Sequence, residues 1–339
     1  MNRKRILWTS IIGAVSFAVL ILDAKTALKG ASDGITLCLY TVVPSLFPFF
    51  VVSSVLNSSL LQSRIALLRP IGRLCGIPKG AESLLLLGLL GGYPVGAQCI
   101  CEAYRCGTVS QNTAKRMLGF CNNAGPAFLF GMVGCLFEEP YVIWILWGIH
   151  ILSALFTGMI IPHKPEESVI LGKREPITFF QSVSNSVRII AQVCAWVILF
   201  RVLITFLELW FAWMLPKETQ VFISGLLELS NGIHQLNYVI IQGCRFVLSA
   251  IMLSFGGICV AMQTASVTAD LGFGLYFPGK AIQVSVSYIL SSVLQYIIFP
   301  ADECWKTPIH ITLTIILISI PAVVSIFKNY SRNFRTNVV

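Results

Sequence analysis

The sequence predicts an all-α polytopic membrane protein with about eight transmembrane helices and two re-entrant helical hairpins in an inverted repeat. Three observations predict this fold. Charged residues make up only 12% of the 339 residues, about half the share in a soluble domain, and the mean hydropathy is +0.80. Long apolar runs alternate with short basic segments. Two apolar runs are interrupted by glycine and polar residues, and these interruptions recur in the same order in both halves.

Eight apolar runs approach the roughly 20 residues that a helix needs to cross a bilayer. The first, residues 6–22, follows a basic N-terminus, and the residues after it form a poor signal-peptide cleavage site, so we expect an uncleaved helix. The other runs cover residues 35–56, 117–137, 141–161, 188–207, 246–269, 281–299 and 309–327.

The spans divide the chain into five segments. We expect an N-terminal helix and loop, a first repeat, a cytoplasmic loop, a second repeat, and a C-terminal helix with a basic tail. In the same order, these segments cover residues 1–34, 35–161, 162–187, 188–299 and 300–339.

Two further apolar runs are predicted to enter the membrane and return to the same side. Residues 83–100 contain the letters GGYPVG, and residues 222–241 contain ELSNG. Glycine, proline and polar side chains interrupt the helical hydrogen-bond ladder, and backbone freed at that depth must line a cavity or face protein. We therefore interpret both runs as re-entrant hairpins.

The distribution of Lys and Arg predicts the orientation in the membrane. With a cytoplasmic N-terminus and eight crossings, the inside segments hold 18 of the 24 basic residues, Lys280 among them, while the outside segments hold five and Arg201 lies within a span. This bias predicts a multi-pass protein of the cell membrane with cytoplasmic N- and C-termini. Because the basic residues lie in loops rather than on one soluble face, we expect no nucleic-acid partner.

An internal repeat relates the two halves. Gly225 follows Gly88 by 137 residues and Met252 follows Met117 by 135, so one shift nearly aligns the hairpins and the spans after them. Paired broken elements in inverted halves point to a secondary transporter with a site near the bilayer midplane. The alternative is that these glycines only let helices pack closely. The adjacent Asn, Glu and Gln side chains favour the transporter, since close packing does not explain them.

Candidate substrate-binding residues lie at the two interruptions and in the spans that follow them. Glycines at the first hairpin tip let backbone N–H groups approach a ligand, and helix ends at that tip favour an anion. Asn122 and Asn123 offer amide donors and acceptors to a ligand, or form interhelical hydrogen bonds instead. The predicted substrate-binding residues are Gly91, Gly92, Tyr93, Pro94, Asn122, Asn123, Asn231, Ser254 and Gln263.

Glu228 is the predicted ion-coupling residue. A carboxylate at bilayer depth is destabilised by a few kcal/mol unless it is paired, protonated or hydrated. A coupling ion or proton would meet that need, whereas a position nearer the interface would remove it. Arg201, the one cation assigned to a span, is a candidate partner for Glu228 or for a substrate carboxylate, unless it snorkels to the interface.

Several motifs resemble the YlbJ family of sporulation integral membrane proteins. In the first half they are PSLFPFF at residues 44–50, GGYPVGA at 91–97 and CNNAGPAF at 121–128. In the second half, LSNG at 229–232 and SFGG at 254–257 are similar to the same family. The likeness covers roughly residues 42–294, which is most of the chain.

The resemblance implies the Gate, or nucleoside-recognition, domain, which also occurs beside the GTPase of ferrous-iron permeases and is related in design to concentrative nucleoside transporters. It implies paired re-entrant hairpins, an endospore-forming bacterium and a role in late spore maturation. The family is associated there with moving dipicolinic acid from mother cell towards forespore. Relatives often carry His two positions before the glutamine, where this chain has Ala261, so no proton role is expected at that position.

We therefore expect a transporter or facilitator for a small, planar, anionic metabolite, most concretely dipicolinic acid. The alternatives are a nucleoside or divalent-metal permease of related fold, and a non-transporting structural protein of spore envelope assembly. An enzyme is not expected, because the spans hold no Ser-His or paired-Asp arrangement, and neither is a cofactor or a bound metal. The expected partners are the anionic substrate and the lipid bilayer, with a homo-oligomer left open.

Overall fold

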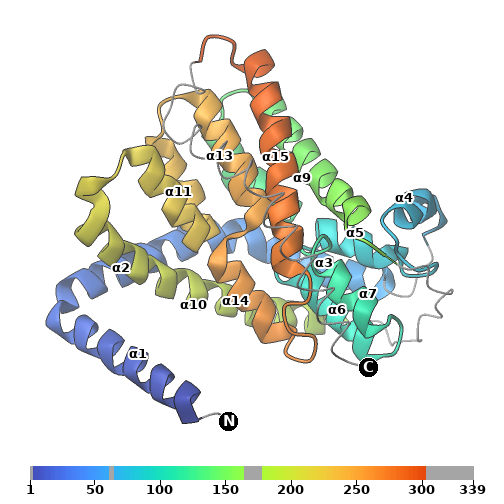
Figure 1. Cartoon of the computed structure of the whole chain (residues 1–339), viewed down its shortest axis with the longest axis horizontal. Helices are drawn as coiled ribbons and strands as arrows, with labels where there is room; N and C mark the ends of the chain where they lie inside the picture. Colours follow the sequence, from blue (N-terminus) through green and yellow to red (C-terminus); the bar gives the residue numbers. More distant parts are fainter. Residues whose placement is uncertain (1–2, 61–64, 164–177, 303–339) are drawn as a thin grey trace, which may run out of the picture.

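The computed structural model describes residues 3–60, 65–163 and 178–302, and this part of the chain contains helices and no strands (Figure 1). Five of its helices are long and apolar enough to cross a membrane, judged by length and composition. They cover Ala24–Val55, Pro140–Ile160, Phe179–Met214, Gln242–Val267 and Tyr276–Ile298. The prediction of an all-helical, multi-pass membrane protein is confirmed, and the count of eight crossings stays a prediction.

The first half of the described chain combines long and short helices and ends with the long helix α9. Its α-helices are α1 (Arg3–Leu22), α2 (Ala24–Leu37), α3 (Val43–Leu60), α4 (Arg69–Leu74), α5 (Glu82–Leu90), α6 (Val95–Arg105), α7 (Gln111–Met117), α8 (Pro126–Phe128) and α9 (Pro140–Ile160). Short π or 3₁₀ turns are η1 (Cys38–Val42), η2 (Ala66–Leu68), η3 (Leu129–Val133) and η4 (Gly134–Leu136).

Apart from the short helix α4, the second half repeats the order of helices found from α3 to α9: a long helix, two short helices in contact, a broken helix and another long helix. Its helices are α10 (Phe179–Phe211), α11 (Lys217–Leu227), α12 (Leu229–Gln235), α13 (Gln242–Phe255), α14 (Gly257–Val267) and α15 (Tyr276–Ile298), with 3₁₀ turns η5 (Ala212–Met214) and η6 (Leu236–Tyr238). The corresponding long helices pack on each other, α3 on α10 and α9 on α15.

Two predicted boundaries are wrong. Residues 24–34, expected as a loop, form most of α2, because the Asp23 carboxylate caps the helix by accepting the backbone N–H of Thr26 at 3.1 Å. Residues 117–137, expected as a transmembrane span, are broken: α7 ends at Met117, residues 118–125 are not helical, and α8 begins at Pro126. Proline has no N–H to continue a helix and is well suited to the first turn of a new one.

Small residues let α2 lie close against α10. A Cβ atom at Gly30 would be 2.8 Å from the Val202 Cα atom, and one at Gly34 would be 2.9 Å from the Ile198 Cα atom. Two glycines four residues apart on one helix face therefore allow backbone-to-backbone packing, as is common between membrane helices. This contact fixes the position of the long helix α10 beside the site described below.

The N-terminal helix α1 extends away from the rest of the molecule (Figure 1). It includes the predicted span at residues 6–22, and its described apolar part, Gly13–Leu22, is shorter than a full span. The predicted span at 309–327, nearly all of the segment at 300–339 and most of the loop at 162–187 lie outside the described residues.

Candidate functional site

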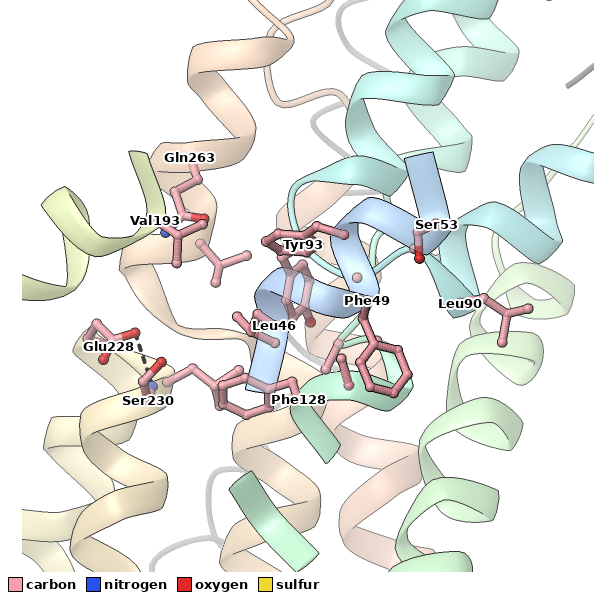
Figure 2. Close-up of a pocket in the computed structure, with 18 residues that line it drawn as sticks. Leu46, Phe49, Ser53, Leu90, Tyr93, Phe128, Val193, Glu228, Ser230 and Gln263 are labelled. Atoms are coloured by element: carbon pink, nitrogen blue, oxygen red, sulfur yellow. Dashed lines mark hydrogen bonds between the residues drawn. The ribbon is translucent and has the colours of Figure 1, made fainter. Parts of the chain in front are cut away.

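The helix breaks of the two halves meet at one pocket (Figure 2). The turn between α5 and α6 contributes residues 91–93, and the junction of α11 and α12 contributes residues 228–230. Side chains of α3, α8, α10 and α14 complete a mainly apolar wall. The pocket holds about 540 Å³ of space between atoms, part of it open to solvent. The two predicted interruptions are thus brought together.

The tip of the first hairpin is held by glycines and by Tyr93. A Cβ atom at Gly88 or Gly96 would collide with the carbonyl oxygen of Cys121, so α5 and α6 both require glycine where they meet the chain between α7 and α8. The Tyr93 hydroxyl donates to the Leu253 carbonyl oxygen at 3.1 Å, beside the break between α13 and α14. The first hairpin therefore contacts the broken helices of both halves.

Glu228 forms the second break and caps α12. Its carboxylate accepts the backbone N–H groups of Ser230 at 3.0 Å and of Asn231 at 2.7 Å, and the Asn231 side-chain amide at 2.7 Å. The residue is only 2% exposed, and these donors replace the water that a buried carboxylate loses. Glu228 lies at the pocket as predicted, and its role in ion coupling stays a prediction.

Asn122 and Asn123 lie behind the pocket wall rather than in it. Asn122 donates to the Thr264 hydroxyl at 2.9 Å and accepts the Ala97 backbone N–H at 3.3 Å, which joins α14 to the start of α6. Asn123 donates to the carbonyl oxygens of Phe120 at 2.7 Å and Gly88 at 3.3 Å. These are the interhelical hydrogen bonds of the alternative interpretation, and a substrate contact by either residue stays a prediction.

The other predicted residues divide between the pocket and its surroundings. Gln263 lines the pocket, and its amide donates to the Cys259 sulfur at 3.3 Å. Ser254 is buried just before the α13–α14 break, and its hydroxyl has no hydrogen-bond partner in the described part of the chain. The predicted residues that line the pocket are Gly91, Gly92, Tyr93 and Gln263, and those that lie outside its lining are Pro94, Asn122, Asn123, Asn231 and Ser254.

Lys280 was missed by the sequence analysis. Assigned there to a cytoplasmic segment, it lies in α15 with 0% exposure, and its ammonium donates to the Asn122 carbonyl oxygen at 2.7 Å and to Gln283 Oε1 at 2.9 Å. Removing it from the inside count leaves 17 basic residues instead of 18 against five outside, so the charge bias remains. The sequence offers only a weak signal for its burial, namely that this lysine stands at the start of a long apolar run.

Arg201 does not pair with Glu228. Its guanidinium forms ion pairs with Asp33 and Glu208, each at 3.3 Å. The three residues line a second, wider and more polar cavity of about 1340 Å³, open solvent included. Asn231 lines this cavity, while its hydrogen-bond partner Glu228 lines the first pocket. The Glu228–Asn231 pair therefore lies between a polar cavity and the apolar pocket.

Comparison with known proteins gives one informative match. The sporulation integral membrane protein YlbJ of Bacillus subtilis (strain 168) is 24% identical to the chain over an alignment that covers 81% of this chain and 73% of the Bacillus protein. No protein-family model matches the chain. No solved structure matches it either.

Proposed function

Because the chain belongs to the YlbJ family of sporulation integral membrane proteins, we propose that it is a transporter or facilitator for a small, planar, anionic metabolite. The most concrete candidate is dipicolinic acid moved towards the forespore, as the family resemblance implies. The observation that carries the proposal is the meeting of the two helix breaks at one pocket, although they are far apart in the sequence. Broken helices that face each other across a cavity are the usual substrate site of secondary transporters.

The repeated order of elements supports the same function. We propose that the halves from α3 to α9 and from α10 to α15 are inverted in the membrane, so that the α5–α6 and α11–α12 hairpins enter from opposite sides. Movement of one half against the other would then open the pocket to each side in turn. The polar cavity around Arg201 is the candidate path to the Glu228 side of the pocket.

The charge of Glu228 explains why transport of an anion would be coupled to a cation. An anionic substrate in the pocket would lie near this buried carboxylate, and two like charges in an apolar site repel strongly. A proton or a monovalent cation at Glu228 removes the repulsion. Substrate and cation would therefore bind together, which is the thermodynamic basis of symport.

Uptake by purified protein in liposomes tests the proposal against its alternatives. Radiolabelled dipicolinate, a nucleoside and ferrous iron are offered separately, with empty liposomes as the control. We expect uptake of dipicolinate alone. Uptake of the nucleoside or of ferrous iron instead would favour a permease of related fold, and no uptake of any of the three would favour the structural role in spore envelope assembly.

A further inference from the structure

Lys280 is a buried cation that is held only by neutral oxygen atoms. Besides the Asn122 carbonyl and the Gln283 amide oxygen, its ammonium approaches Asn123 Oδ1 at 3.3 Å and the Tyr93 hydroxyl at 3.4 Å. Among the described residues, no carboxylate lies within ion-pairing distance of it. A buried charge without a counter-ion is unfavourable unless its surroundings are arranged to solvate it.

The oxygen atoms around Lys280 are oriented by hydrogen bonds that do not involve the lysine. Tyr93 donates its hydroxyl proton to Leu253, Asn123 donates its amide protons to Gly88 and Phe120, and Gln283 donates its amide to Asn123 Oδ1 at 2.9 Å. Each side chain therefore presents an acceptor towards the ammonium, because its donors are used elsewhere. Converging acceptors repel one another unless a cation lies between them.

We propose that these oxygens form a site for a monovalent cation and that the Lys280 ammonium occupies it. Two tyrosine rings lie beside the site, with Nζ at 5.3 Å from the Tyr93 centroid and 5.9 Å from the Tyr276 centroid. The site joins the first hairpin tip, the break after α7 and helix α15. The tethered cation thus holds together three segments that meet beside the pocket.

Thermal unfolding of purified Lys280→Ala protein in detergent tests this proposal. We expect the variant to melt several degrees below wild type in choline chloride, because the oxygens lose their cation. Replacing choline with methylammonium at the same ionic strength should restore much of the loss in a concentration-dependent way, since a ligand that binds only the folded state stabilises it. Wild type should show no such preference. An undiminished melting temperature of the variant, or equal melting in choline and methylammonium, would overturn the proposal.

Two further variants keep the test decisive. In Lys280→Met an apolar side chain of similar length fills the site, so methylammonium should have no selective effect, and a response equal to that of Lys280→Ala would show a general salt effect and refute a specific site. If Lys280→Ala does not fold, Lys280→Gln takes its place. The glutamine side chain ends one atom short of the position of the lysine nitrogen, so ammonium is then the added cation instead of methylammonium. The measurement involves no substrate, so its outcome is independent of the proposed transport.

Discussion

At the scale of single residues, the account depends on buried polar groups around the pocket and on what each contacts. Glu228 is capped by N–H groups of α12 and faces the apolar pocket. Asn123 and Lys280 lie outside the pocket lining and contact each other, and Lys280 also contacts the hydroxyl of Tyr93, which lines the pocket (Figure 2 shows Tyr93 and Glu228 at the pocket). We therefore propose that Glu228 responds to a ligand, and that Asn123 and Lys280 stabilise the pocket wall.

Replacing Glu228 by Gln should abolish gradient-driven uptake of dipicolinate and leave exchange of substrate across the membrane intact. Glutamine keeps the shape but not the charge, so it no longer needs a cation to accept an anionic neighbour. Gradient-driven uptake and counterflow exchange are compared in liposomes with equal amounts of protein. Since glutamine also offers only one acceptor oxygen to the α12 N–H groups, the melting temperature must be measured to exclude misfolding. Gradient-driven uptake at the wild-type rate contradicts the coupling role.

Replacing Asn123 by Ala should lower the stability of the protein and weaken uptake together. The change leaves the carbonyl oxygens of Phe120 and Gly88 without these donors and removes an acceptor from Lys280. A buried polar group left unpaired costs about 1 to 3 kcal/mol. Asn237→Ala is the matched control, because this exposed asparagine donates only to the His234 carbonyl three residues before it. The prediction fails if both variants melt at the same temperature.

At the scale of elements, close backbone contact positions the first hairpin. Replacing Gly88 by Ala should lower the melting temperature and reduce uptake, because the new Cβ atom meets the backbone carbonyl of Cys121, which cannot move without shifting the break. Gly148→Ala in α9 is the control. Nothing lies within 4 Å of its Cβ position, so alanine should be neutral or stabilise the helix by up to about 1 kcal/mol. Equal melting of the two variants refutes the packing argument.

The sequence predicted those elements that are marked by a few neighbouring residues. Both breaks were found because glycine, proline or a buried carboxylate stands in an apolar run, as at Gly92 and Glu228. Residues 118–125 were assigned to a full span, because hydropathy averaged over the run does not register the length of the non-helical segment before Pro126. Lys280 was misplaced for a different reason. Its burial depends on oxygens from three distant segments, and such a long-range arrangement leaves almost no local trace in the sequence.

At the scale of the whole molecule, the charge bias predicts a topology that labelling can check. A cysteine at Glu139 should react with a membrane-impermeant maleimide added to whole cells, and one at Lys79 should react only after the membrane is opened. Both positions are exposed on the protein, and the basic residue belongs on the cytoplasmic side. Reaction of both from the same side would refute the predicted orientation and, with it, the inverted arrangement of the two halves.

The central claim is that both helix breaks contact one anionic substrate, and protection of pocket cysteines tests it most directly. Ser53→Cys lies on α3 and Ser230→Cys at the second break, and both positions line the pocket. The rate of maleimide modification at each position is followed by mass spectrometry with and without dipicolinate, and the exposed Glu139→Cys variant is the control. The account predicts that dipicolinate slows modification at both pocket positions and leaves the control unchanged. Unchanged rates at Ser53→Cys and Ser230→Cys in folded protein would contradict it.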